Sequence, residues 1–261
     1  MKSFLDSALK LSAIVVILVG TTGVYANPQV TLDTNSYSDV YGGGEFTALG
    51  TGLSTASYSS SALMNGGFET FCQAYSEEFV PGQTYSYTLG NSILSDTKGG
   101  ASIPLSLGTA YLYSQFAQGI LTGYDYNLSG AGGDFSSRQA AATALQIALW
   151  WAEGENVGGA HNQGAPNGSG TLGASGYNAS NVFENMIVTK FGLTGALAAS
   201  NGADGVQLLI LTNDNPHDGS TPYAQPQLYY SNVPDGGTTA LLLGAALIGL
   251  AAVGRGARKK A

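Results

Sequence analysis

Short runs of β-branched and aromatic residues lie within residues 30–89 and again within residues 206–230, and turn residues separate them. Runs of this length and composition are typical of antiparallel strands joined by tight turns. The triplet Gly42-Gly43-Gly44 and the pair Pro81-Gly82 are interpreted as two of these turns. The predicted strands cover residues 30–33, 45–49, 68–75, 84–89, 206–211 and 225–230.

Apolar positions at helical spacing fill the middle of the chain, between the fourth and fifth predicted strands. Helices are expected from about Leu105 to Gly119 and over residues 178–191. The strongest helical stretch is residues 140–152, in which Ala and Leu dominate and only two side chains are polar. One of the two is Gln146. A helix that is apolar on nearly every side buries this carboxamide, which then needs partners inside the protein.

The order of these elements predicts an α+β fold, because strands come first, helices lie in the middle and strands come last. We expect short antiparallel strands that form a β-sandwich or barrel-like core, with a helical middle section beside it. A hydrophobic stretch near the C-terminus adds one more predicted helix outside this core. The 261 residues are enough for one sizeable core or two small ones.

Charged residues are scarce and unevenly placed. They make up 10% of the chain, against about a quarter in ordinary globular proteins, and glycine contributes 38 residues. Six of the nine Lys and Arg residues lie in the two ends, so residues 27–232 carry three basic and fifteen acidic side chains, a net charge of −12. Such an acidic domain has no basic surface for phosphate groups, which excludes nucleic-acid binding. The composition favours a secreted, turn-rich domain.

The first 26 residues have the three parts of a secretory signal peptide. Lys2 and Lys10 supply the basic region, residues 11–19 form the apolar core, and small residues precede a cleavage point after Ala26. The apolar run is too short to span a membrane comfortably, which makes a permanent anchor the weaker interpretation. The mature chain is therefore expected to be exported and to begin at Asn27.

Residues 233–261 also have three parts: a short motif, a hydrophobic run and a basic end. The motif is Val233-Pro234-Asp235-Gly236, the run covers residues 238–253, and four of the last seven residues are Arg or Lys. A basic end of this kind stays in the cytoplasm, which places the rest of the chain outside. A plain anchor helix is the alternative to a sorting signal.

The tail resembles a PEP-CTERM sorting domain in its VPD-G-type variant, on the basis of the motif, the Leu/Gly/Ala-rich helix and the basic end. The resemblance implies recognition by an exosortase-type membrane protease in a Gram-negative bacterium that exports polysaccharide. The transmembrane tail would anchor the precursor in the inner membrane, and the processed protein would reach the cell surface or the extracellular space. The predicted regions are a signal peptide at 1–26, an ectodomain at 27–232 and a sorting tail at 233–261.

Few side chains in the ectodomain suit catalysis or metal binding. Two His and one Cys do not provide a zinc site, and no Gly-x-Ser-x-Gly motif is present. The Asn/Asp-rich residues 213–219 offer oxygen ligands for calcium, but Asx-turns explain them equally well. Five glutamates could include an acid/base pair for glycoside hydrolysis, but the sequence singles out no two of them. We expect no enzyme activity, cofactor or metal site. The glutamates are Glu69, Glu77, Glu78, Glu153 and Glu155.

Cys72 and Gln146 carry the most specific chemical hypothesis. A lone cysteine in an exported protein cannot form an internal disulfide. An aromatic-Cys pair at 71–72 and the sequence Gln-Ile-Ala-Leu-Trp at 146–150 resemble the two motifs of bacterial thioester domains. The resemblance implies an internal Cys72–Gln146 thioester that an amine or hydroxyl can attack. Alternatively, Cys72 packs as a small apolar residue and Gln146 binds strand backbone in the core. The candidate thioester pocket consists of Phe71, Ile147 and Trp150.

Three functional hypotheses follow. The first is an exported surface or extracellular-matrix protein, structural or associated with exopolysaccharide and biofilm, that an exosortase-type system sorts. The second is a covalent adhesin whose Cys72–Gln146 thioester captures surface amines or hydroxyls. A glycan-processing enzyme is a distant third, because the fifteen Tyr and two Trp offer stacking surface for sugars but such residues more often lie in the core.

Overall fold

The computed structural model describes residues 27–38, 43–51, 53, 67–75, 77–95, 101–126, 137–155, 177–212 and 223–231. Several predictions fall outside these residues: the signal peptide at 1–26, the candidate calcium loop at 213–219 and the sorting tail at 233–261 with its motif and hydrophobic run. Within the described part of the chain, no helix combines the length and the apolar character needed to cross a membrane.

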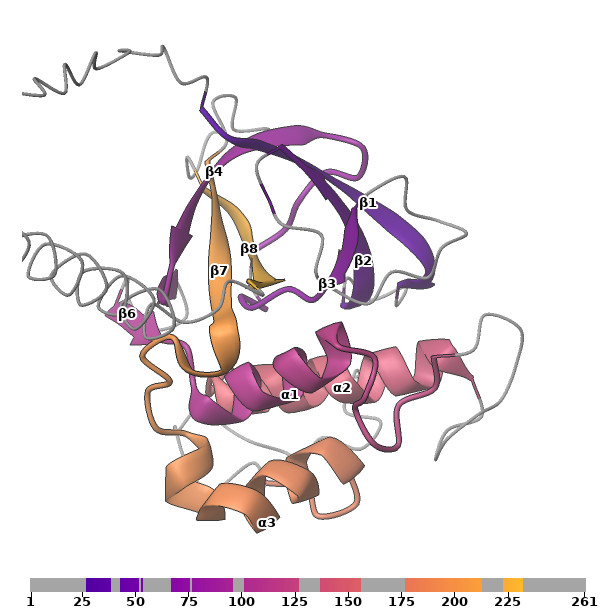
Figure 1. Cartoon of the computed structure of the whole chain (residues 1–261), viewed down its shortest axis with the longest axis vertical. Helices are drawn as coiled ribbons and strands as arrows, with labels where there is room; N and C mark the ends of the chain where they lie inside the picture. Colours follow the sequence, from indigo (N-terminus) through magenta and orange to yellow (C-terminus); the bar gives the residue numbers. More distant parts are fainter. Residues whose placement is uncertain are drawn as a thin grey trace, which may run out of the picture.

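Six antiparallel strands form one sheet, in the order β3-β2-β1-β4-β7-β8 (Figure 1). A separate antiparallel pair, β5 (Ser92–Ser95) and β6 (Ala101–Pro104), follows β4 in the chain. The bounds of the six strands are β1 Gln29–Ser38, β2 Gly44–Gly50, β3 Phe68–Thr70, β4 Thr84–Gly90, β7 Val206–Thr212 and β8 Tyr223–Tyr230.

The six-stranded sheet curls into a half-barrel, so that its two edge strands approach each other (Figure 1). After β3, the chain leaves β2 and contacts β8 at the opposite edge. The Leu228 N–H donates to the Phe71 carbonyl and the Gln73 N–H donates to the Pro226 carbonyl, both at 3.0 Å. The predicted strand at 68–75 is therefore wrong in its second half, because those residues contact the other edge of the sheet instead of extending β3.

Three helices lie together against one end of the curled sheet (Figure 1). They are α1 (Leu107–Ala117), α2 (Arg138–Ala152) and α3 (Val182–Ala196). α1 and α2 contact the strands, and α3 packs against both of these helices. A polar side chain caps each helix by accepting backbone N–H groups of the first turn. The three N-caps are Ser106, Ser137 and Asn181.

The third helix differs from the predicted range of 178–191. It begins later, because the Asn181 side chain accepts two N–H groups of the first turn and so sets the start. It also continues beyond the predicted end, through a kink at Gly192, where φ is 71°. Glycine adopts this left-handed backbone readily, so the chain turns there and then resumes helical geometry up to Ala196.

Apolar side chains form one large cluster between the helices and the sheet and a smaller one on the strands. The mixture of antiparallel strands with a helical middle section confirms the predicted α+β class. The large cluster includes Phe71, Leu112, Leu145, Phe183 and Leu228. The smaller cluster includes Val30, Leu32, Phe68, Tyr85 and Leu211.

Candidate functional site

Cys72 lies where the two edges of the curled sheet meet. It follows the end of β3 and forms an isolated antiparallel bridge with Gln227 of β8. The side chain is fully buried, in a small apolar cluster with Phe46 of β2 and Trp150 of α2. The single cysteine of the chain is therefore in contact with both the sheet and the helices.

The structure brings Gln146 of α2 into direct contact with Cys72. The Gln146 side chain is 1% exposed, and its Nε2 donates to the Cys72 carbonyl at 2.8 Å. Its Oε1 accepts the Cys72 N–H at 3.2 Å and also the Cys72 thiol at 3.2 Å. The sulfur therefore lies beside the carboxamide group that it would have to attack.

A second backbone N–H reaches the same oxygen from β2. The Gly44 N–H donates to Gln146 Oε1 at 3.3 Å, so two main-chain donors, from Gly44 and Cys72, converge on one carbonyl oxygen. Two convergent N–H groups stabilise the negative charge that develops on such an oxygen when a nucleophile adds to its carbon. The same contacts satisfy a buried glutamine that has a structural role alone.

The Gly44 N–H reaches Gln146 because the chain passes very close to α2 just before β2. A Cβ on Gly43 would lie 2.7 Å from Trp150 Cη2 and 3.0 Å from Gln146 Cγ, closer than ordinary van der Waals contact. Gly44 itself has a φ of 94°, in the left-handed region that favours glycine. The sequence predicts only a turn here. A run of three glycines directly before a strand is the signal that could have indicated a close backbone approach.

The three predicted pocket residues lie on different sides of the pair. Trp150 packs directly with Cys72, and Ile147 is buried on the same helix with 9% exposure. Phe71 belongs to the large cluster between the helices and the sheet, where its ring meets Phe116 of α1 edge-on at 4.9 Å. Trp150 is therefore the pocket candidate that shares an apolar cluster with Cys72.

Burial raises the pKa of the Cys72 thiol far above its ordinary value. Hydrogen bonding from the Cys72 backbone and from the Trp150 side chain lowers this pKa by smaller amounts. The Trp150 side chain, which packs in the same apolar cluster as Cys72, therefore favours the thiolate. The resting thiol is thus protonated at neutral pH, and an attack on Gln146 must transfer its proton.

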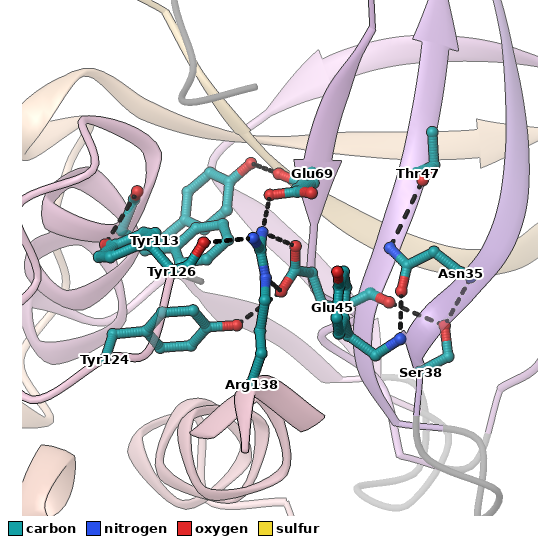
Figure 2. A network of polar contacts seen from close by, with 11 residues as sticks. Asn35, Ser38, Glu45, Thr47, Glu69, Tyr113, Tyr124, Tyr126 and Arg138 are labelled. Carbon is teal, nitrogen blue, oxygen red and sulfur yellow. Dashed lines mark hydrogen bonds and ion pairs between the residues drawn. The ribbon is translucent and has the colours of Figure 1, made fainter. Parts of the chain in front are cut away.

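In the first turn of α2, Arg138 connects the helix to two strands (Figure 2). Its guanidinium binds Glu45 of β2 through Nη2 at 2.5 Å and through Nε at 3.0 Å. Nη2 also binds Glu69 Oε2 of β3 at 2.6 Å, and the Tyr124 hydroxyl donates to Glu45 at 2.6 Å. Sequence reasoning missed this cluster, although Arg138 is one of three basic residues in the range 27–232, which is itself a signal.

Two of the other chemical candidates bind groups inside the protein, and both histidines lie outside the described residues. Of the glutamates considered for glycoside hydrolysis, Glu69 binds Arg138, and Glu153 accepts a backbone N–H just before α1 at 2.9 Å. No group of three His, Cys, Asp or Glu residues in the described ranges is placed to hold a metal ion. The two histidines, His161 and His217, lie outside those ranges.

The contacts among Cys72, Gln146 and Gly44 are thus the arrangement in the described residues that best suits a chemical reaction. In comparisons with protein-family models, with curated proteins and with solved structures, nothing matches this chain.

Proposed function

We propose that this chain is an exported surface protein that forms an internal thioester between Cys72 and Gln146 and uses it for covalent attachment. The observation that carries the proposal is the 3.2 Å contact between the Cys72 thiol and the Gln146 carboxamide oxygen, which also accepts two backbone N–H groups. The export signals in the sequence support a location outside the cell. In this proposal, a hydrophobic helix in the tail anchors the precursor in the inner membrane until an exosortase-type protease processes it.

In thioester formation, the Cys72 sulfur replaces the amide nitrogen on the Gln146 side chain. The Cys72 sulfur adds to Cδ of Gln146, while the N–H groups of Gly44 and Cys72 stabilise the negative charge on Oε1. The Cδ–Nε2 bond then breaks, the thiol proton passes to the departing nitrogen, and ammonia leaves. The Cys72 carbonyl accepts an Nε2 hydrogen at 2.8 Å and so orients this nitrogen before it departs.

A thioester survives only where water is kept away from it. The Cys72 side chain is fully buried and Gln146 is 1% exposed, so bulk solvent does not reach the pair. Two edge-on aromatic contacts, with ring centroids 4.8 and 5.0 Å apart, close this region on the side of the thiol. The shielding rings are those of Phe46, Tyr75, Phe79 and Trp150.

Attachment reverses the first step with a different nucleophile. Once the aromatic cover opens, an amine or hydroxyl group adds to Cδ of Gln146, the Sγ–Cδ bond breaks, and Cys72 recovers its thiol while an amide or ester forms. Sulfur leaves more readily than an alkoxide or an amide nitrogen, because the ordinary pKa of a thiol is about 8.5, and the proton of the incoming nucleophile passes to the buried sulfur as it leaves. Each molecule reacts once, which suits adhesion to surface amines or to the hydroxyls of an exopolysaccharide and does not suit catalytic turnover.

A non-covalent structural protein of an exopolysaccharide or biofilm matrix, with the same sorting signals, is the second candidate. One observation favours it: burial raises the pKa of Cys72, which keeps the thiol neutral and weakly nucleophilic. In that case, Gln146 serves to join α2 to the curled sheet through its hydrogen bonds.

The intact mass of the purified full chain distinguishes the two candidates. We expect a mass lower by one ammonia, and a methylamine adduct after incubation with methylamine. The Cys72→Ala and Gln146→Glu variants should show neither change, because each lacks one reacting group.

Gln139→Glu is the matched control. It makes the same substitution on the same helix, at an exposed position where Gln139 binds the Ser38 carbonyl. This variant should lose ammonia as the wild type does. An unchanged wild-type mass, together with complete alkylation of Cys72 in the denatured protein, would refute the thioester and leave the structural role.

A further inference from the structure

In the buried cluster around Arg138, all three guanidinium nitrogens donate hydrogen bonds (Figure 2). Besides the two glutamates, the guanidinium donates through Nη1 to the Tyr126 carbonyl at 2.9 Å. Its central carbon also lies 4.5 Å from the centre of the Tyr37 ring. Arg138 is 2% exposed, and Glu45 and Glu69 are fully buried. The orientation of the guanidinium is therefore determined by β1, β2, β3 and the segment after α1.

Each charged member of the cluster lies close in the chain to one member of the reacting group. Glu45 directly follows the glycine whose N–H binds the carboxamide oxygen. Glu69 precedes the cysteine by three residues. Arg138 precedes Gln146 on α2 by eight residues, about two helical turns or 12 Å. The cluster thus joins α2, which carries the carboxamide, to β2, which carries the Gly44 donor, and to β3, which directly precedes the segment with the thiol.

A buried ion cluster of this kind is weak evidence for stability, because desolvation of the charges offsets much of their attraction. Its geometry is more informative. A guanidinium presents its donors in a rigid planar fork, so two carboxylates that share it are held at a fixed separation and angle. Bond formation between two side chains needs this kind of control, since a misplacement of about 1 Å can slow a reaction about a hundredfold.

We propose that Arg138, Glu45 and Glu69 form a positioning clamp that sets the distance between the Cys72 thiol and the Gln146 carboxamide, an inference that rests on the proposed thioester. The clamp acts through the backbones of β2, β3 and α2. Arg138 fixes how far α2 lies from the two strands, and the carboxylates fix how the strands lie relative to each other at the site.

Two variants test the clamp in the full chain. Arg138→Lys keeps the positive charge but loses the planar fork, and Glu69→Gln keeps the size and shape of the side chain but loses its charge. We expect both to fold and to lose ammonia at least about tenfold more slowly than the wild type, because the reacting groups no longer meet in one geometry. The readouts are intact mass at fixed times after synthesis and the melting temperature of the same samples.

Glu153→Gln is the matched control. Glu153 is another buried carboxylate, at the C-terminal end of α2, where it accepts the Ser106 N–H at 2.9 Å. Its substitution should lower the melting temperature without slowing the loss of ammonia. A purely stabilising role for the clamp would give the same pattern in Arg138→Lys and Glu69→Gln.

Each outcome decides a different point. If the clamp variants melt at lower temperature yet lose ammonia at the wild-type rate, the clamp is overturned and the thioester stands. If the wild type itself keeps its ammonia, the thioester fails and the clamp fails with it. If Arg138→Lys does not fold, Glu69→Gln decides, since the amide has nearly the same volume as the carboxylate it replaces.

Discussion

At the scale of single residues, the local sequence pattern predicts the burial of Gln146 but not its hydrogen-bond partners. The apolar pattern of residues 140–152 predicts that its carboxamide is buried, and the side chain is 1% exposed. Its partners come from far along the chain: Cys72 is 74 residues away and Gly44 is 102 residues away. Local periodicity predicts that a side chain is buried, but it does not predict which distant backbone groups the side chain contacts.

Glu184 gives a prediction at the same scale. This carboxyl group is buried in the first turn of α3, where one oxygen accepts the Asn178 N–H at 2.7 Å. The other oxygen has no hydrogen-bond partner among the described residues. Burial raises the pKa of Glu184 from an ordinary 4.5 to about 8, and the Asn178 N–H lowers it by a smaller amount. The folded protein therefore keeps a proton here that the unfolded chain has already lost at neutral pH.

The free energy of unfolding should consequently fall as the pH rises from about 4.5 to about 8 and change no further above that. In Glu184→Gln, which cannot ionise, this part of the pH dependence should be absent. Urea denaturation at about pH 5 and about pH 8 measures the difference for both proteins. An identical pH dependence in the wild type and the variant would show that Glu184 is ionised in the folded protein.

At the scale of elements, the close approach of β2 to α2 determines whether the Gly44 N–H can reach Gln146. In Gly43→Ala, the new methyl group would lie 2.7 Å from the Trp150 ring and 3.0 Å from Gln146 Cγ, so one element must shift. We expect the free energy of unfolding to fall by about 1–3 kcal/mol and ammonia loss to become slower. Urea denaturation and intact mass measure the two effects.

The control for this prediction is Gly195→Ala in α3. There the added Cβ would lie 3.3 Å from Phe191 Cβ, away from the candidate thioester, so only stability should change. If Gly43→Ala loses ammonia as fast as the wild type, the distance between β2 and α2 has little effect on the reaction, and the second N–H donor is dispensable.

At the scale of the whole molecule, the half-barrel and the helices meet at the candidate site. The segment after β3 contacts β8, and this contact places Cys72 between the two edges of the sheet and α2. The site therefore depends on the complete curl of the sheet. A chain that formed its local strands and helices without this closure would leave the thiol and the carboxamide apart.

The proposed sorting tail gives a prediction at the scale of the whole chain. Deletion of residues 233–261 should release the protein from the cell or misplace it, because the proposed anchor and recognition motif are lost. Fractionation of cells and medium, followed by immunodetection, measures the location. Unchanged surface retention after the deletion would contradict the sorting proposal.

A motif variant separates sorting from plain anchoring. Pro234→Ala combined with Asp235→Ala leaves the hydrophobic run and the basic end in place. Processing by an exosortase-type protease predicts that this variant accumulates as an unprocessed, membrane-bound precursor. A plain anchor helix predicts the same molecular mass and location as the wild type.

The sequence by itself determined the kinds of elements and the burial of the main helix. Alternating and helical periodicities follow from the backbone geometry of a strand or a helix, which points every second or every third to fourth side chain toward the core, so strands at 30–33, 84–89 and 206–211 and a helix at 140–152 followed from local patterns. The resemblance of two short motifs to those of bacterial thioester domains also implied that Cys72 and Gln146 are partners, and the structure places their side chains in contact.

Only the tertiary structure decided the details that matter for chemistry. The second half of the predicted strand at 68–75 joins β8, Gly44 donates to Gln146, and Arg138 binds two strands at once. These contacts arise where elements distant in sequence dock, so they depend on the curl of the sheet and the approach of α2. No local propensity specifies such distances, because they result from the packing of the whole core.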